Sequence, residues 1–85
     1  MQALEDTGVF AYAAGEEVVA VIKDAEVLDI ERGLIVAQAA LPPWVIGNVV
    51  ACVRRGGAAA YVLRYRYDGR AHVCVVEANA IEGAA

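Results

Sequence analysis

The side chains of this chain best suited to acid–base chemistry are one histidine and a run of carboxylates. His72 is the single imidazole, a group that can transfer protons near neutral pH. A histidine-activated nucleophile has almost no candidates, because the chain has no serine and Thr7 is its one aliphatic alcohol. Carboxylates between Glu16 and Glu31 could act as a pair only if the fold brought two of them into one cleft, which their spacing does not require. We therefore expect no enzymatic activity and no cofactor, and rank an enzymatic or small-ligand-binding oligomer below other functions.

The two cysteines do not have the spacing of a metal site. Cys52 and Cys74 stand far apart, each within an apolar run, and one histidine cannot complete a zinc site with them. Buried cysteine behaves as a small hydrophobic residue. We expect two core thiols and no bound metal, with a disulfide or a reactive thiol as the alternatives.

The element that positions His72 is a predicted hairpin. Two β-rich runs flank Asp68-Gly69, a pair typical of a two-residue hairpin turn, and this turn places Tyr65 opposite His72 and Leu63 opposite Cys74. His72 is then a hydrogen-bonded core residue rather than a base. One face of the hairpin, predicted as core, carries Tyr61, Leu63, Tyr65, His72, Cys74 and Val76. The opposite face, predicted as either solvated or a contact surface, carries Val62, Arg64, Arg66, Ala71, Val73 and Val75.

Charge is unevenly distributed along the chain, whose net charge is -4. Residues 1–31 carry eight acidic side chains against Lys23, and residues 32–70 carry six arginines against Asp68. The two halves could pair within one subunit or head to tail between subunits, leave an arginine face for an anionic ligand, or form two solvated faces of opposite sign.

The length of 85 residues indicates a single domain, residues 1–85. Hydrophobic residues make up 60% of the chain and the mean hydropathy is +0.50, more than so small a domain can bury. Such a surplus favours a homo-oligomer, a dimer or a tetramer, or a surface for a protein partner.

The uncharged residues 33–53 have the length of a membrane span, but Pro42-Pro43 interrupts them, so two buried strands are expected instead. The amino terminus is acidic and lacks a signal-peptide core. We expect a cytoplasmic protein that does not bind membranes.

Strand-like segments separated by turns fill the rest of the chain. We expect strands at residues 9–13, 18–23, 34–41 and 44–54, a bulge at Gly47, a turn at residues 55–57 and a helical turn at 77–81. Residues 16–32 also fit a helix. The predicted fold is mainly β, with about five to six strands in a small SH3-like barrel or a strongly bent antiparallel sheet.

Short motifs across residues 15–82 resemble the SH3-like small barrels, which include Tudor and KOW modules. The similar segments are Gly15-Glu16-Glu17-Val18, Trp44-Val45-Ile46-Gly47-Asn48-Val49-Val50, Tyr61-Val62-Leu63 and the stretch from Val75 to Glu82. The resemblance implies a barrel fold.

A narrower resemblance is to the plasmid- and integron-borne type II dihydrofolate reductases, which are tetrameric barrels with a Val-Gln-Ile-Tyr segment in the pore. The matching segment here is Val73-Cys74-Val75-Val76, where Cys74 replaces the glutamine and Val76 the tyrosine. The resemblance therefore implies an oligomeric barrel of a bacterial integron cassette without that activity.

Two binding hypotheses follow. In the first, the protein is a non-enzymatic interaction or self-assembly module that uses an apolar face edged with arginines. In the second, which the net acidity disfavours, a basic stripe from Arg54 to Arg70 binds nucleic acid, with Trp44 or a tyrosine as a stacking surface. Because it follows two prolines, Trp44 is expected to be a core residue more often than such a surface. The candidate binding residues are Trp44, Arg54, Arg55, Val62, Arg64, Arg66, Val73 and Val75.

Overall fold

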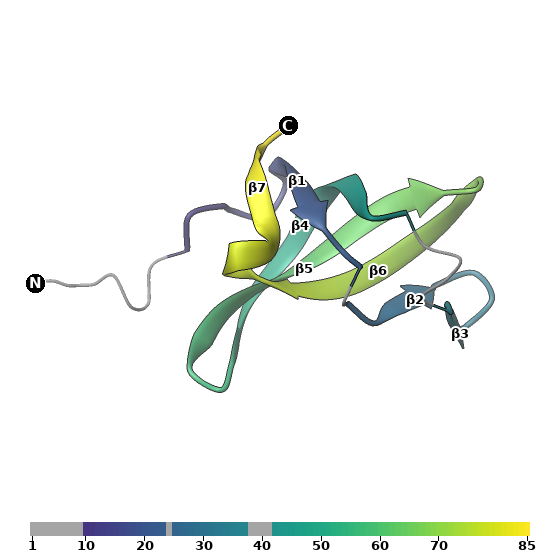
Figure 1. Ribbon diagram of the computed structural model, residues 1–85, viewed down its shortest axis with the longest axis horizontal. Helices are drawn as coiled ribbons and strands as arrows, with labels where there is room; N and C mark the ends of the chain where they lie inside the picture. The colour runs from purple at the N-terminus through teal and green to yellow at the C-terminus, as the bar shows by residue number, and fades with distance from the viewer. Residues whose placement is uncertain (1–9, 24, 38–41) are drawn as a thin grey trace, which may run out of the picture.

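The computed structural model describes residues 10–23, 25–37 and 42–85, and these form a single antiparallel sheet (Figure 1). The order of its seven strands is β3-β2-β6-β5-β4-β1-β7. Their bounds are β1 (Glu17–Val21), β2 (Val27–Asp29), β3 (Leu34–Ile35), β4 (Trp44–Arg55), β5 (Ala58–Tyr67), β6 (Arg70–Glu77) and β7 (Ile81–Ala84), with a 3₁₀ turn, η2 (Ala78–Ala80), before β7.

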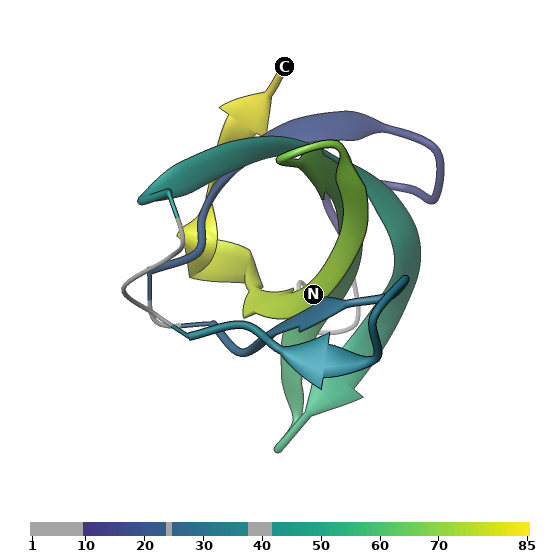
Figure 2. The same ribbon diagram turned by 90° about the vertical axis from the view of Figure 1, so that its right-hand side faces the viewer.

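The sheet curls strongly around its core (Figure 2). It does not close, because β3 and β7 form its two ends and do not pair with each other. The predicted mainly β fold and strongly bent antiparallel sheet are confirmed, with seven strands instead of five to six. No helix among the described residues is long and apolar enough to cross a membrane.

The helix considered for residues 16–32 is wrong, since the described residues of this segment form β1, β2 and turns. Val18 and Ala20 are fully buried while Val19 and Val21 are half-buried, which is the two-residue period of a strand. A turn follows, in which the Ala25 amide donates to the Ile22 carbonyl at 2.9 Å. The segment is therefore a strand, although the spacing of its apolar residues also fits a helix.

Three strand predictions change at their boundaries. The described residues 10–13 form no strand, and residue 9 lies outside the described part of the chain. Of residues 34–41, only Leu34 and Ile35 form a strand, and residues 38–41 lie outside the described part. The helical turn at 77–81 is confirmed as η2, but the chain then continues into β7, which pairs with β1.

The β-bulge of β4 lies between Val49 and Ala51, three residues beyond the predicted position at Gly47. Gly47 has another role, because a Cβ there would stand 3.2 Å from the Arg64 carbonyl oxygen. The glycine lets β4 approach β5 closely. At the bulge, Val50 is the extra residue and points outward.

The predicted hairpin of β5 and β6 is confirmed in its register. Tyr65 pairs with His72 and Leu63 with Cys74, and the turn holds Asp68 at φ 54° and Gly69 at φ 76°. Two consecutive positive φ angles are those of a type I′ turn, for which Asp-Gly is suited. All six residues predicted as core, Tyr61, Leu63, Tyr65, His72, Cys74 and Val76, are at most 4% exposed.

The core between the curled strands is completed by the segment that precedes β1. The Ala11 amide donates to the Tyr61 hydroxyl at 2.9 Å, and the rings of Phe10 and Tyr12 meet the Tyr61 ring edge to face. The core thus occupies the inner side of the sheet, and the outer side of β1, β4 and β5 is left to solvent.

Candidate functional site

The outer side of the sheet carries one continuous surface over β1, β4 and β5. Glu17 pairs with Asn48, and Asn48 pairs with Arg64, so these three side chains form one cross-strand row. A shallow open hollow lies on the same surface. We define the outer face by the exposed residues that line this hollow, which are Glu17, Ile46, Asn48, Val50, Arg64 and Arg66.

The outer face exposes large apolar side chains at its centre. Ile46 and Val50 are each 50% exposed, and Trp44, farther along β4, is 55% exposed. The interpretation of Trp44 as a core residue is therefore wrong. Strand alternation turns Trp44, Ile46 and Asn48 outward together, and the bulge adds Val50 to them.

The predicted contact residues of the β5–β6 hairpin lie beside the outer face. Arg64 pairs with Val73 and Val62 pairs with Val75, and the three valines are half-buried. The apolar surface continues to Leu28 on β2, which pairs with Val73 and is 36% exposed. The structure thus brings Val62, Arg64, Arg66, Val73 and Val75 together, as the hairpin register predicts.

The predicted basic stripe is divided among separate places. Arg54 lies over the Phe10 ring and donates to the Gly57 carbonyl, at the turn between β4 and β5. Arg70 pairs with Asp29 and Asp68, at the opposite end of β6 from Glu77. Only Arg64 and Arg66 of the arginines in the stripe belong to the outer face.

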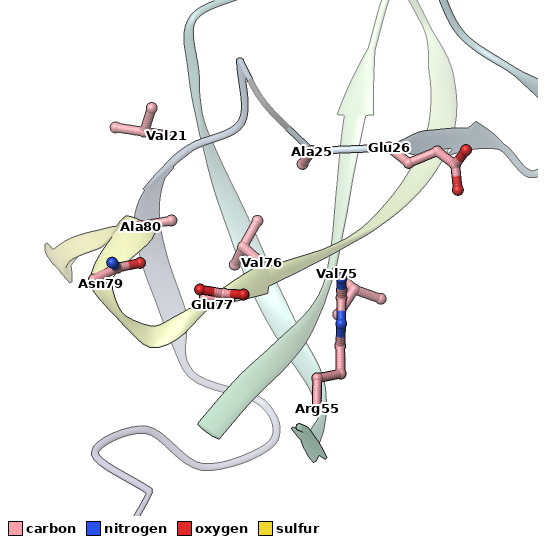
Figure 3. A pocket seen from close by; sticks show the side chains of 9 residues that line it. All are labelled: Val21, Ala25, Glu26, Arg55, Val75, Val76, Glu77, Asn79 and Ala80. Carbon is pink, nitrogen blue, oxygen red and sulfur yellow. The ribbon is translucent and has the colours of Figure 1, made fainter. Parts of the chain in front are cut away.

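Arg55 lines a second hollow, a groove of about 540 Å³ (Figure 3). The groove lies where the pairing of β2 with β6 has ended at Cys74, between the end of β6, η2 and the chain that follows β1. The carboxylates of Glu26 and Glu77 lie at it together with the Arg55 guanidinium. The structure records no ion pair among these three residues, so the groove holds no assembled polar site.

Asp29, which is not among the predicted site residues, organises a polar cluster where β2 meets β6. It is 3% exposed, and its Oδ1 accepts the backbone amides of Glu31 and Arg32 at 3.1 Å each. Its Oδ2 accepts from Nε of Arg70 at 3.0 Å. Burial alone would raise the pKa of Asp29, but the hydrogen bonds from Arg32 and Arg70 outweigh it and hold that pKa below the ordinary value of 3.8.

His72 belongs to this cluster and is buried opposite Tyr65, as the hairpin register predicts. It is 3% exposed, its ring stacks on Tyr65 with centroids 5.5 Å apart, and its Nδ1 lies 3.0 Å from the Arg70 carbonyl oxygen. Its Nε2 is 3.9 Å from Asp29 Oδ2, beyond hydrogen-bond distance. The imidazole is therefore enclosed by side chains and lines neither the hollow of the outer face nor the groove at Arg55.

The two thiols are free, which excludes the disulfide between them. Cys74 is buried as predicted, and burial raises its pKa to about 11, so it stays a protonated core thiol. Cys52 is half-buried and its Sγ donates to the Tyr12 carbonyl oxygen at 3.3 Å. No group of three or more metal-ligating side chains occurs within residues 10–23, 25–37 and 42–85.

No family model, curated protein or solved structure matches this chain. The fold and the site therefore define it as a small, strongly bent antiparallel β domain with a partly apolar outer face. The similarities to SH3-like barrels and to type II dihydrofolate reductases stay predictions from short motifs.

Proposed function

We propose that this domain is a non-enzymatic interaction module, of cytoplasmic location, that binds protein surfaces through its outer face. The observation that carries the proposal is the 50% exposure of both Ile46 and Val50 between charged side chains of opposite sign, Glu17 and Arg64. An apolar centre with a polar rim is the usual anatomy of a protein–protein contact.

The apolar side chains of this surface offer part of the free energy that binding requires. Full burial of an aliphatic side chain contributes about 1.5–3 kcal/mol, so the exposed halves of Ile46 and Val50 offer roughly 1 kcal/mol each. Trp44 adds a larger apolar area, and tryptophan and arginine are the residues that contribute strongly at interfaces. These side chains gain this free energy only when a partner covers them.

The groups that could support catalysis are committed elsewhere, which favours a binding role. His72 and Cys74 are buried, and Asp29 is occupied by backbone amides and by Arg70. In contrast, the guanidinium of Arg64 forms no hydrogen bond or ion pair with any of the described residues. Arg64 is thus a charged group of the outer face that is free to contact a ligand.

A second candidate is single-stranded nucleic acid. The exposed Trp44 ring could stack on a base while Arg64 and Arg66 contact phosphates, which is how many small β domains bind such strands. The net charge of -4 and the dispersal of the other arginines weaken this candidate.

Photo-crosslinking from the outer face distinguishes a protein partner from single-stranded nucleic acid. Val50 is replaced by p-benzoylphenylalanine, and the matched control places the same residue at Glu82, which is exposed on β7. We expect irradiation of cells that express the full chain to give a discrete protein adduct from position 50 and none from position 82.

An adduct that nuclease removes would favour nucleic acid instead. Equal labelling from both positions, or none from position 50, would overturn the proposed use of the outer face.

A further inference from the structure

We propose that the outer face binds the outer face of a second copy of this chain, about a two-fold axis that runs along β4. This inference rests on the proposed function and names its partner. It follows from the arrangement of charge across the three strands.

The cross-strand row places opposite charges symmetrically about one residue. Glu17 on β1 and Arg64 on β5 both pair with Asn48 on the central strand β4. Adjacent strands are about 4.8 Å apart, so the two charges stand at nearly equal distances on either side of Asn48. Neither side chain has an ion-pair partner among the described residues of its own chain.

A surface of this kind is complementary to itself under one rotation. In a two-fold dimer the same patch meets itself, so each residue on one side of the axis contacts the residue on the other side. An axis along β4, lying between the two sheets, places Glu17 of each copy against Arg64 of the other. An axis across the strands would place Glu17 on Glu17 and Arg64 on Arg64, which like-charge repulsion disfavours.

The same axis also brings the apolar side chains of the two copies into contact. Ile46 and Val50 lie on β4 on either side of Asn48 and are half exposed, so each contacts its own counterpart in the second copy. The two Asn48 amides meet at the axis, where each has a donor for the acceptor of the other. Sheets that stack face to face keep their strands within about 30° of each other, and an axis along β4 gives this alignment.

The size of the patch indicates a weak dimer. Three strands cover a width of about 15 Å, and five residues of β4 cover a similar length. A patch of these dimensions covers roughly 225 Å², so two patches bury on the order of 500 Å² in total, which is small even for a transient complex. Because the charges at its rim are exposed, we expect micromolar to millimolar dissociation that weakens at high salt.

Exchanging the charges of Glu17 and Arg64 tests both the identity of the partner and the direction of the two-fold axis. Sedimentation equilibrium of the purified full chain at low salt should show a monomer–dimer equilibrium. Glu17→Arg and Arg64→Glu should each weaken the dimer about tenfold or more, since each leaves two like-charged contacts. The double variant Glu17→Arg/Arg64→Glu should dimerise as the wild type does, and an equimolar mixture of the single variants should form the heterodimer.

A wild-type chain that stays monomeric at millimolar concentration would overturn this inference, and so would a dimer insensitive to both single substitutions. Failure of the double variant to recover dimerisation, with its β-sheet circular dichroism unchanged, would overturn the axis. The proposed function is tested separately. If position 50 crosslinks to a different protein and the chain stays monomeric, the outer face is still a binding surface, but its partner is not a second copy.

Discussion

Replacement of Leu63 by alanine should lower the free energy of unfolding by about 3 kcal/mol. Leu63 is fully buried at the centre of the sheet, where it pairs with Val49 on one side and Cys74 on the other. Three strands hold the walls of the resulting cavity in place, so little collapse can offset the loss. Domains of this size have about 4–13 kcal/mol of stability in total, so this is a large fraction of it.

Val62→Ala is the matched control, because Val62 precedes Leu63 on the same strand and lies half-buried on the other side of the sheet. We expect it to cost less than about 1 kcal/mol. Urea denaturation followed by circular dichroism measures both variants. Equal losses would contradict the assignment of the two faces of β5.

Replacement of Asp29 by asparagine should weaken the attachment of the β2–β3 hairpin and lower the urea midpoint at neutral pH. The carboxylate joins the turn after β2 to β6, through the amides of Glu31 and Arg32 and through Nε of Arg70. Asparagine keeps an oxygen for the amides but removes the buried charge beside Arg70, which is then left with the exposed Asp68 as its opposite charge.

The stability that Asp29→Asn loses should be larger at neutral pH than in strong acid. The pKa of Asp29 is lower in the folded chain than its ordinary value of 3.8, so its ionised form contributes stability that is fully present above that value. This contribution is lost as the pH falls through the folded-state pKa, which lies below 3.8. The urea midpoints of wild type and Asp29→Asn should therefore differ at pH 7 and converge in strong acid.

Asp68→Asn is the control for this prediction. Asp68 also faces Arg70, at 3.5 Å, but its side chain is 77% exposed. An exposed ion pair contributes little, so the midpoint should change much less than for Asp29→Asn. Identical midpoints for wild type and Asp29→Asn at pH 7 would contradict the role of Asp29.

The sequence predicts the β5–β6 hairpin well because its information is local. Asp68-Gly69 determines the turn, the turn determines the register, and the register assigns Leu63 inward and Arg64 outward. The outward position of Arg64 beside Val73 is therefore predicted correctly, whereas Ala71, expected on the same side of the hairpin, is buried.

The other parts of the site depend on contacts between distant segments. β2 has three residues and leaves too short a pattern to recognise, and Asp29 is buried only because β6 lies beside it. The sequence does carry one signal for this site, because Asp29 is followed four residues later by Gly33. Such residues favour a turn in which the aspartate side chain accepts hydrogen bonds from backbone amides. The outward position of Val50 depends likewise on pairing of β4 with β5.

The central claim is that the outer face of this domain binds the outer face of a second copy of the chain. A concentration series of amide nitrogen–proton NMR spectra, from micromolar to millimolar chain at low salt, tests it residue by residue. The account predicts progressive shifts at Glu17, Ile46, Asn48, Val50 and Arg64, with little change in the β2–β3 hairpin. Shifts confined to Ile30, Leu34 and Ile35, or spectra independent of concentration, would contradict it.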